Sequence, residues 1–348
     1  MKKEKNVFPC APKFGGRKRG AELIKHFSFK KGSSFVQQFR LIFMSKLVVT
    51  TGKRYADIDG LACVVAYAEI PVERPLAVID GPLNNSVTNI IRSWKMNYLI
   101  KLEPSDYRFV IVDVSEEKEF PLFVTKDRVV EIYDHHFGFE KDWSYLGDKC
   151  KIEPVGACAT LIWEAFKKTK LPLITDNQLL ITPLSANLLF TAIVSNTLNF
   201  QASVTADRDK KAFEELKTFT CLPDNWIAQY YQDQEVSVYT DPASAVANDT
   251  KFQIIKGMKC AVGQVELWNS KDFLKDHQNT IEIVLREFNP ECWFFISPSI
   301  TEARTYIFTR NESIKDLLRS VMEIDFFGTD VGVTKKLWLR KEILKLIQ

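Results

Sequence analysis

The chain has 348 residues, of which 46% are hydrophobic and 26% charged, the composition of a globular protein with room for two domains. No apolar run reaches the roughly 18–20 residues that a membrane span needs, so we expect no membrane partner. The seven cysteines include no Cys-x-x-Cys pair, so neither a disulfide framework nor a zinc ribbon is expected, and a reducing, cytoplasmic setting fits best.

The net charge of +3 conceals two segments of opposite sign. Residues 1–43 hold eleven Lys and Arg against two acids, a net +9, so residues 44–348 carry −6. The first segment lacks periodicity and is rich in Gly, Ser and Lys, so we expect a disordered basic extension. Three uses stay open: an appendage to a protein that starts at Met44, an organelle-targeting peptide, or a nucleic-acid-binding arm. Nucleic acid is not an expected partner of the acidic body.

From residue 44 onward, short apolar runs alternate with helical patterns. Strands are predicted at 46–50, 75–80, 108–114 and 129–134, and helices at 59–70, 87–94 and 156–169. Apolar strands that alternate with helices are typical of a parallel sheet covered on both faces. We therefore predict an α/β domain over residues 44–232, closed by a charged helix within 207–224.

The pattern changes after this helix. A polar stretch at 232–249 would suit a hinge. It is followed by a predicted hairpin at 252–268 that turns at Lys256-Gly257, a helix at 270–288, strands at 292–299 and 304–310, and a helix at 312–324. We predict that residues 233–348 form a smaller α+β domain with mixed strand pairing.

Carboxylate and imidazole side chains follow three of the predicted strands. The first strand is followed by Asp57 and Asp59, the third ends at Asp113, and the fourth ends at Asp134, His135 and His136. In an open parallel sheet these ends lie along one edge, where ligands bind. Asp57 or Asp59 alone would make an ordinary helix cap, but the joint pattern predicts a metal site.

Four motifs in this order resemble those of the DHH phosphoesterase superfamily, in the branch of family II inorganic pyrophosphatases and exopolyphosphatases. They are GKRYADID at 52–59, the aspartate of VIVDVS at 113, the Asp-His-His triplet at 134–136, and SNTLNFQASVTADRD at 195–209. The resemblance covers about residues 46–345. It implies a DHH domain followed by a DHH-associated domain.

The resemblance implies roles for the strand-end residues. Asp57, Asp59, Asp113 and His135 would hold two ions, with Asp113 bridging them and acting in catalysis. His136 would face the phosphate as a catalytic hydrogen-bond donor. Carboxylates with imidazole suit Mn(II) or Mg(II).

The resemblance also implies a basic phosphate site in the second domain. Arg340 and Lys341 in LRKEIL and Lys251 in DTKF would bind the substrate phosphate. Two positions depart from the family pattern, with Lys53 where histidine is usual and Asn196 where aspartate is usual. We therefore expect one firmly held ion and a second that binds weakly, with Lys53 or Asn196 as a weak metal or substrate contact.

The predicted function is metal-dependent hydrolysis of a phosphoanhydride, either pyrophosphate or short polyphosphate, by metal-activated water between the two domains. Two alternatives stay open. One is a weakened or non-catalytic family member that binds phosphates or a protein partner, and the other is a DHH phosphodiesterase or nuclease. The expected partner is a small phosphate-containing molecule, and no oligomeric state is predicted.

Overall fold

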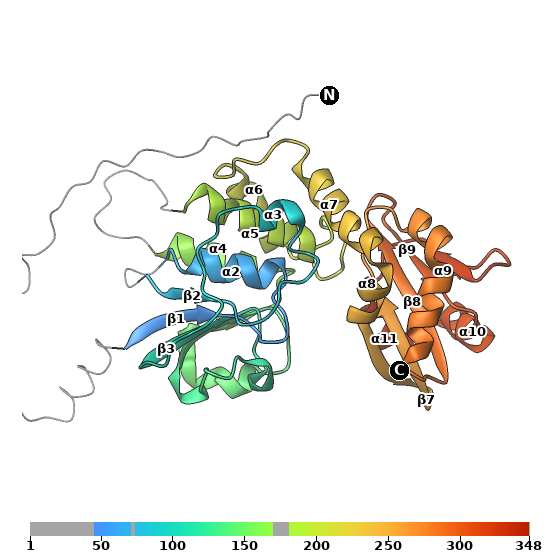
Figure 1. Ribbon diagram of the computed structural model, residues 1–348, viewed down its shortest axis with the longest axis horizontal. Helices are drawn as coiled ribbons and strands as arrows, with labels where there is room; N and C mark the ends of the chain where they lie inside the picture. The colour runs from blue at the N-terminus through green and yellow to red at the C-terminus, as the bar shows by residue number, and fades with distance from the viewer. Residues whose placement is uncertain (1–44, 71–73, 170–180, 348) are drawn as a thin grey trace, which may run out of the picture. The chain divides into compact units, whose positions relative to one another are not determined.

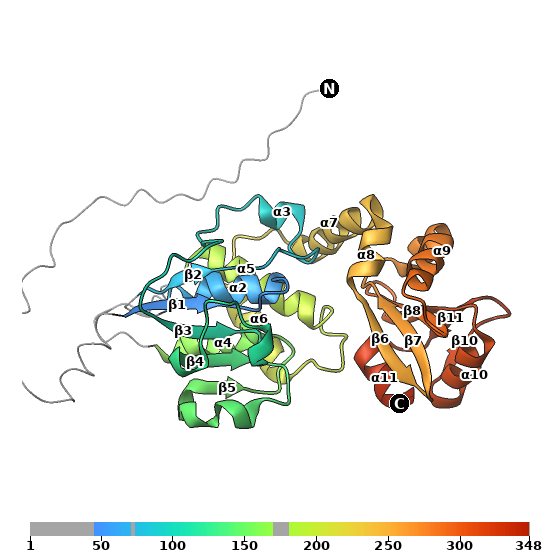
Figure 2. The same cartoon turned by 60° about the horizontal axis from the view of Figure 1, so that its bottom comes forward.

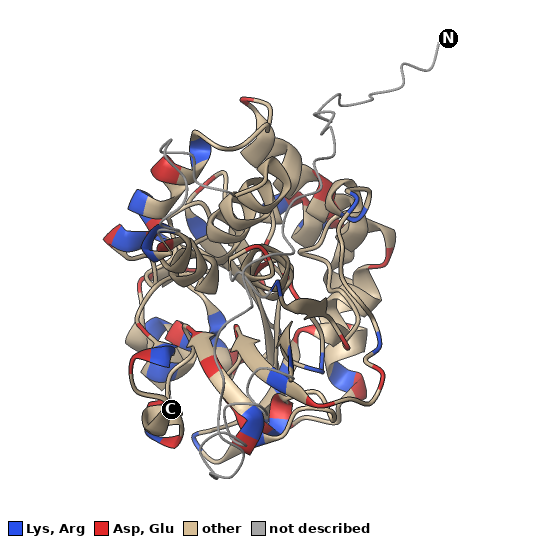
Figure 3. Ribbon diagram, turned by 90° about the vertical axis from the view of Figure 1, so that its left-hand side faces the viewer, with Lys and Arg blue, Asp and Glu red and all other residues tan. Residues whose placement is uncertain are grey.

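A computed structural model describes residues 45–70, 74–169 and 181–347 of the chain (Figure 1). The basic extension predicted at 1–43 lies outside the described residues. None of the helices described is both long and apolar enough to cross a membrane. Basic and acidic positions are interspersed over the described ribbon when it is seen from the side in Figure 3.

Five parallel strands form the first sheet, in the order β2-β1-β3-β4-β5. This confirms the predicted α/β class; strands β1 to β4 coincide with the predicted apolar runs, whereas β5 was not predicted. The strands are β1 Lys46–Thr50, β2 Leu76–Val78, β3 Tyr107–Val112, β4 Val129–Asp134 and β5 Cys150–Ile152; the α-helices are α2 Ile58–Tyr67, α3 Asn89–Arg92, α4 Cys158–Lys168, α5 Pro183–Asn196 and α6 Asp207–Lys217; the 3-10 helices are η1 Glu117–Glu119, η2 Lys126–Arg128 and η3 Glu140–Lys149.

The two faces of this sheet are covered differently. Helices α2, α4 and α5 lie over one face (Figures 1 and 2), where they share a core with Val49 of β1. The neighbouring Val48 points to the other face, as the period of two in a strand requires, and shares a core there with Phe120 and Trp143. In the described chain this second face is therefore closed by aromatic side chains next to η1 and within η3 rather than by long helices.

Strand β1 marks the point where the strand order reverses, because β2 lies on one side of it and β3 on the other. In open parallel sheets the crevice outside the carboxyl ends of the strands at this point is the usual ligand site. The segments that follow β1, β3 and β4 leave the sheet at this edge. They carry the aspartates and histidines noted in the sequence.

The second sheet has six strands in the order β10-β11-β9-β8-β7-β6, with β7 and β8 parallel and the other neighbours antiparallel. Helices α8 and α9 pack on one face, and α10 and α11 on the other. The predicted hairpin is confirmed, because Lys256 and Gly257 join β6 to β7 with φ of 50° and 82°, as in a type I′ turn. The elements are α7 Trp226–Thr240, α8 Pro242–Asn248, β6 Thr250–Ile255, β7 Met258–Gln264, α9 Ser270–Glu287, β8 Cys292–Ser299, β9 Arg304–Phe308, α10 Glu312–Val321, β10 Ile324–Asp325, β11 Val331–Thr334 and α11 Arg340–Ile347.

Helix α7 contributes to two cores. Tyr230 and Tyr231 belong to the core of the first sheet, whereas Val238 belongs to a core of the second. The predicted domain boundary after residue 232 falls within α7, between these side chains. The polar stretch at 232–249, expected as a hinge, is almost entirely helical and is broken at Asp241. Its proline stands at the first position of α8, where a missing N–H does no harm.

The sequence suggested no disulfide framework, and the described residues contain one disulfide, between Cys260 and Cys292. The two residues are partners in the register of the parallel strands β7 and β8, and their Cα atoms are 4.7 Å apart. They are separated by 32 positions in the sequence, in no recognisable spacing. The two cysteines meet because of the register of β7 and β8, and this register cannot be predicted from the sequence.

Candidate metal centre

The loop after β1 supplies two aspartates with different surroundings. Asp57 is the N-cap of α2, and its Oδ1 accepts from the backbone N–H groups of Asp59 at 3.0 Å and Gly60 at 2.9 Å. Asp59 is fully buried, and its two oxygens accept from the N–H groups of Cys158 at 2.7 Å and Ala159 at 2.8 Å. The start of α4 therefore fixes the orientation of the Asp59 carboxylate, and its dipole favours the negative charge.

Asp113 follows β3 in the left-handed region, with φ of 60°, which aspartate tolerates better than most residues. Its Oδ1 is buried and has no hydrogen-bond partner in the described chain. A ring nitrogen of His135, Nε2, lies 3.4 Å from this oxygen. A buried polar atom of this kind needs a physical explanation, such as an ion.

His135 has a defined tautomer. Its Nδ1 lies 3.2 Å from the carbonyl oxygen of Val155, which can only accept, so Nδ1 carries the proton and Nε2 keeps its lone pair. This Nε2 lies 3.4 Å from Asp113 Oδ1 and 3.9 Å from Asp59 Oδ2. Burial, followed by the charge of His136, lowers the pKa of His135 to about 3. The neutral ring is the form that binds a metal ion.

Asp134 is buried and holds both histidines of the triplet. Its Oδ1 accepts from the backbone N–H groups of His135 at 2.7 Å and His136 at 3.1 Å, and from Nδ1 of His136 at 2.8 Å. Partial desolvation lowers the pKa of His136, but the hydrogen bond to Asp134 and the negative charges of Asp134 and the neighbouring carboxylates together raise it. The His136 side chain is 63% exposed, so its Nε2 is open to a ligand. Asp113, His135 and His136 offer ligand atoms that all lie within 4.8 Å of one another.

The carboxylates of this cluster disfavour one another's ionisation. Burial and then the charge of Asp57 raise the pKa of Asp59 to about 7, and burial with the charges of Asp57 and Asp59 raises the pKa of Asp113 well above its usual value. No Lys or Arg in the described ranges forms an ion pair with these three residues. A divalent cation would reverse both shifts, so the donor set fits Mn(II) or Mg(II).

No protein-family profile matches this chain. It is 22% identical over 294 residues to a manganese-dependent inorganic pyrophosphatase of Methanothrix thermoacetophila, over 78% of this chain and 88% of the relative. It is 21% identical over 301 residues to another from Methanocaldococcus jannaschii, over 84% and 95%. The sequence resemblance is confirmed. A crystal structure from Methanococcus jannaschii, assigned as a family II inorganic pyrophosphatase, shares the fold with a TM-score of 0.62 at 20% identity, over 86% of this chain and 96% of that one.

The two positions that depart from the pyrophosphatase pattern have different surroundings. Asn196, the last residue of α5, donates its side-chain amide to Asp59 Oδ2 at 2.6 Å and so lies at the centre. The ammonium group of Lys53 donates instead to the carbonyl oxygen of Lys118. Among the described residues it forms no ion pair with a carboxylate of the centre.

The basic residues of the second domain differ in availability. Arg340 is buried at the start of α11, where its guanidinium pairs with Asp249 Oδ1 at 2.5 Å and donates to the carbonyl oxygens of Asp249 and Val262. Lys341 and Lys251 are exposed, and their ammonium groups form no hydrogen bond or ion pair within the described chain. Although the Lys251 residue is exposed as a whole, partial desolvation of its ammonium group by the surrounding protein, and then the charge of Arg340, lower its pKa. Two of the three predicted cations are therefore available to an anion.

Sequence reasoning missed the groups that hold the predicted ligands. The carbonyl of Val155 and the N–H groups of the first turn of α4 are backbone groups, which leave no side-chain signature. Asp134 directly precedes the two histidines in the sequence. This position is the only sequence feature that could have predicted that its carboxylate accepts hydrogen bonds from them.

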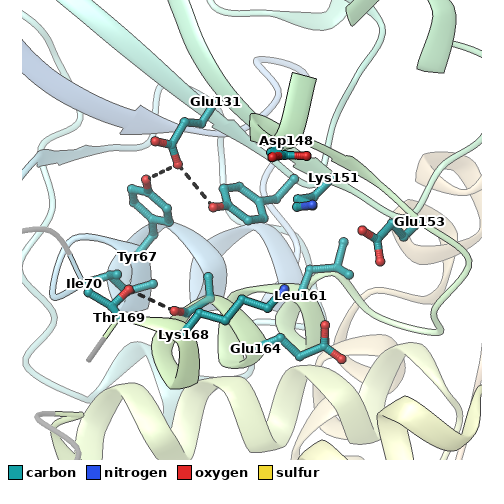
Figure 4. A pocket seen from close by; sticks show the side chains of 12 residues that line it. Tyr67, Ile70, Glu131, Asp148, Lys151, Glu153, Leu161, Glu164, Lys168 and Thr169 are labelled. Carbon is teal, nitrogen blue, oxygen red and sulfur yellow. Dashed lines mark hydrogen bonds between the residues drawn. The ribbon is translucent and has the colours of Figure 1, made fainter. Parts of the chain in front are cut away.

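A separate cavity of about 340 Å³ lies beside the other end of α4 (Figure 4). Tyr67 and Tyr133 both donate to Glu131 Oε2 there, at 2.7 and 3.2 Å. No predicted site residue lines this cavity. It is therefore distinct from the candidate metal centre.

Proposed function

We propose that this protein is a metal-dependent phosphohydrolase that cleaves a phosphoanhydride bond in pyrophosphate or a short polyphosphate. One observation carries the proposal: Asp113 Oδ1 and His135 Nε2 lie 3.4 Å apart, and the proton of His135 is on its other nitrogen. A cation would satisfy both acceptors. The relatives are manganese-dependent pyrophosphatases, which supports this metal and reaction class.

Asp59, Asp113 and His135 would hold the ion, with Asp57 close by. Bound Mn(II) or Mg(II) supplies a nucleophilic water at neutral pH and neutralises charge on the phosphoryl oxygens. Asp59 is fully buried, and the side chains of Asp113 and His135 are only 7% and 11% exposed, so little bulk water reaches these ligands and their electrostatic interactions are strengthened. Asn196 brings no negative charge to the centre, so we expect one firmly bound ion and a second that is weaker.

His136 and two lysines would bind the substrate. The hydrogen bond from His136 Nδ1 to Asp134 fixes the ring, so that a protonated Nε2 can donate to a phosphoryl oxygen. The charge of Lys341 adds to burial and to the charge of His136 in lowering the pKa of His135, so this ammonium group acts on the same region. Lys251 lies two residues after Asp249, the ion-pair partner of Arg340.

The guanidinium group of Arg340 is not free to bind phosphate. Its guanidinium group is occupied by Asp249, and a phosphate contact would require exchange of that carboxylate for phosphate. The ion pair anchors the first turn of α11, which carries Lys341. We therefore propose that Lys341 and Lys251 supply most of the phosphate contacts.

Phosphate release tests the proposal. Pyrophosphate, tripolyphosphate and a dinucleotide would each be incubated with the protein in Mn(II) or Mg(II). We expect release from the first two substrates, lowered on the order of 100-fold or more in Asp113→Asn. Cleavage of the dinucleotide alone would identify a phosphodiesterase and contradict the proposal.

A second candidate is a protein that binds phosphates without hydrolysing them. It is favoured by the amide of Asn196, which donates to an Asp59 oxygen that a second cation would otherwise use. Binding of pyrophosphate in the presence of Mn(II) without phosphate release would support this candidate.

A further inference from the structure

Asp209 is a fully buried carboxylate outside the metal centre. It is the third residue of α6 and accepts from the backbone N–H of Ala206 at 2.7 Å, as an acidic residue at this position of a helix often does. The same carboxylate also accepts from the N–H of Gly156 at 2.7 Å and the hydroxyl of Thr160 at 2.6 Å. Capping of α6 needs only the bond from Ala206. The bonds from Gly156 and Thr160 instead connect Asp209 to the segment that leads into α4.

The segment bound by Asp209, residues 155–159, holds two side chains of the metal centre. The carbonyl oxygen of Val155 accepts from His135 Nδ1 at 3.2 Å and so sets its tautomer. The first two N–H groups of α4 donate to the two oxygens of Asp59, at 2.7 and 2.8 Å. Asp209 is therefore linked to two of the predicted ligands, His135 and Asp59, through one short piece of backbone.

The backbone at Gly156 is packed tightly against neighbouring side chains. A Cβ atom at this position would lie 2.8 Å from Asp209 Oδ2 and 2.7 Å from Thr197 Cγ2, both closer than carbon approaches non-bonded atoms. Thr197 follows Asn196 directly, so the segment lies between α6 and the end of α5. The close approach of Asp209 to the backbone needs glycine here.

We propose that Asp209 is a positioning residue of the metal centre, which holds the 155–159 segment so that Val155 orients His135 and α4 orients Asp59. The inference rests on the proposed function, because it concerns the ion proposed there. Groups that orient metal ligands without touching the ion typically change metal affinity by about 10- to 100-fold when they are removed.

Titration with Mn(II) in the absence of substrate tests the inference, with the signal of free Mn(II) in electron paramagnetic resonance as the readout. The variant is Asp209→Asn, which keeps the size of the side chain but places an amide among three hydrogen-bond donors. The matched control is Glu215→Gln. Glu215 also lies on α6 and ties it to α4 through Trp163 Nε1 at 2.6 Å and the ammonium of Lys167, away from the 155–159 segment.

We expect Asp209→Asn to weaken Mn(II) binding by about tenfold or more, and Glu215→Gln to stay within about twofold of the wild type. Both variants should lower the unfolding temperature. An Asp209→Asn variant that unfolds earlier but binds Mn(II) as the wild type does would show that Asp209 only joins α6 to α4, and would overturn the inference.

Two further outcomes are informative. If Asp209→Asn does not fold, Thr160→Val removes one of the three bonds to Asp209, and an unchanged Mn(II) affinity in that variant would overturn the inference. If the wild type binds no Mn(II), the proposed function fails and the inference with it. The wild-type titration therefore separates the two kinds of failure.

Discussion

At Asp113 the chain combines three unfavourable features: a left-handed backbone, a buried oxygen without a hydrogen-bond partner, and like-charged neighbours in Asp57 and Asp59. The backbone conformation and the unsatisfied oxygen each cost about 1–3 kcal/mol. A bound divalent ion would offset both the missing partner and the repulsion. The metal-free protein should therefore be least stable where these carboxylates are ionised.

The first prediction is that the metal-free protein loses stability as the pH rises above about 6.5. The pKa of Asp113 is raised in the folded state, so the folded chain holds a proton that the unfolded chain has released, and rising pH favours unfolding. Below that pH, the lowered pKa of His135 acts in the opposite direction, because the unfolded chain then binds the extra proton. Above this pH, the raised pKa of His136 adds to the loss of stability, because the folded chain keeps a proton that the unfolded chain has released.

Thermal unfolding in a chelator, at pH about 6.5 and about 8.5, measures this effect. Asp113→Asn should remove much of the loss that the wild type shows between the two pH values. An equal loss in both proteins would mean that Asp113 does not titrate in this range.

The second prediction concerns the two departures from the family pattern. Asn196→Asp adds a negative charge beside Asp59 and should tighten Mn(II) binding by about tenfold. Lys53→His should change the affinity by less than about twofold, because the Lys53 ammonium is bound to the carbonyl of Lys118. Titration of both single variants and the double variant with Mn(II) measures the contribution of each position to metal affinity. A comparable gain from Lys53→His would contradict the placement of this side chain.

At the scale of single elements, α11 shows how adjacent residues can serve different purposes. Arg340 at its first position is buried and paired with Asp249, whereas Lys341 at its second is exposed. The sequence could predict that the pair Arg-Lys is basic. It could not predict that Arg340 is occupied, because its partner lies 91 residues earlier in the chain.

The third prediction follows from this division. Arg340→Ala should lower the free energy of unfolding by about 2–3 kcal/mol, less than for a fully buried pair because Asp249 is half exposed. Lys341→Ala should leave stability nearly unchanged but weaken pyrophosphate binding. Denaturant unfolding and pyrophosphate titration of both variants provide the comparison. The account is contradicted if Arg340→Ala is as stable as the wild type.

The fourth prediction concerns strands β7 and β8. The disulfide between Cys260 and Cys292 closes a loop of 32 positions, which corresponds to about 3–4 kcal/mol of stabilisation from the reduced entropy of the unfolded chain. Cys292→Ser should lower the denaturation midpoint accordingly, and a reducing agent should lower the midpoint of the wild type but not of the variant. If the reducing agent has no effect on the wild type, the cysteines are not paired in solution.

At the scale of the whole molecule, the sequence predicted what depends on local pattern. The strands at 46–50 and 129–134 were predictable because each is rich in β-branched and apolar residues, and the turn at Lys256-Gly257 because it is short and contains glycine. The Asp and His residues of the centre were predictable by their chemistry and their positions at strand ends. Contacts between distant segments, such as Asp209 with Gly156, were not, because no local pattern encodes them.

The most direct test of the central claim is an anomalous-difference map, recorded at the manganese absorption edge, from crystals grown or soaked with Mn(II). The account predicts a peak within about 2.5 Å of Asp113 Oδ1 and His135 Nε2, with Asp59 as a further ligand. A map in which the strongest peak lies elsewhere, with Asp113 and His135 unbonded to any ion, would contradict it.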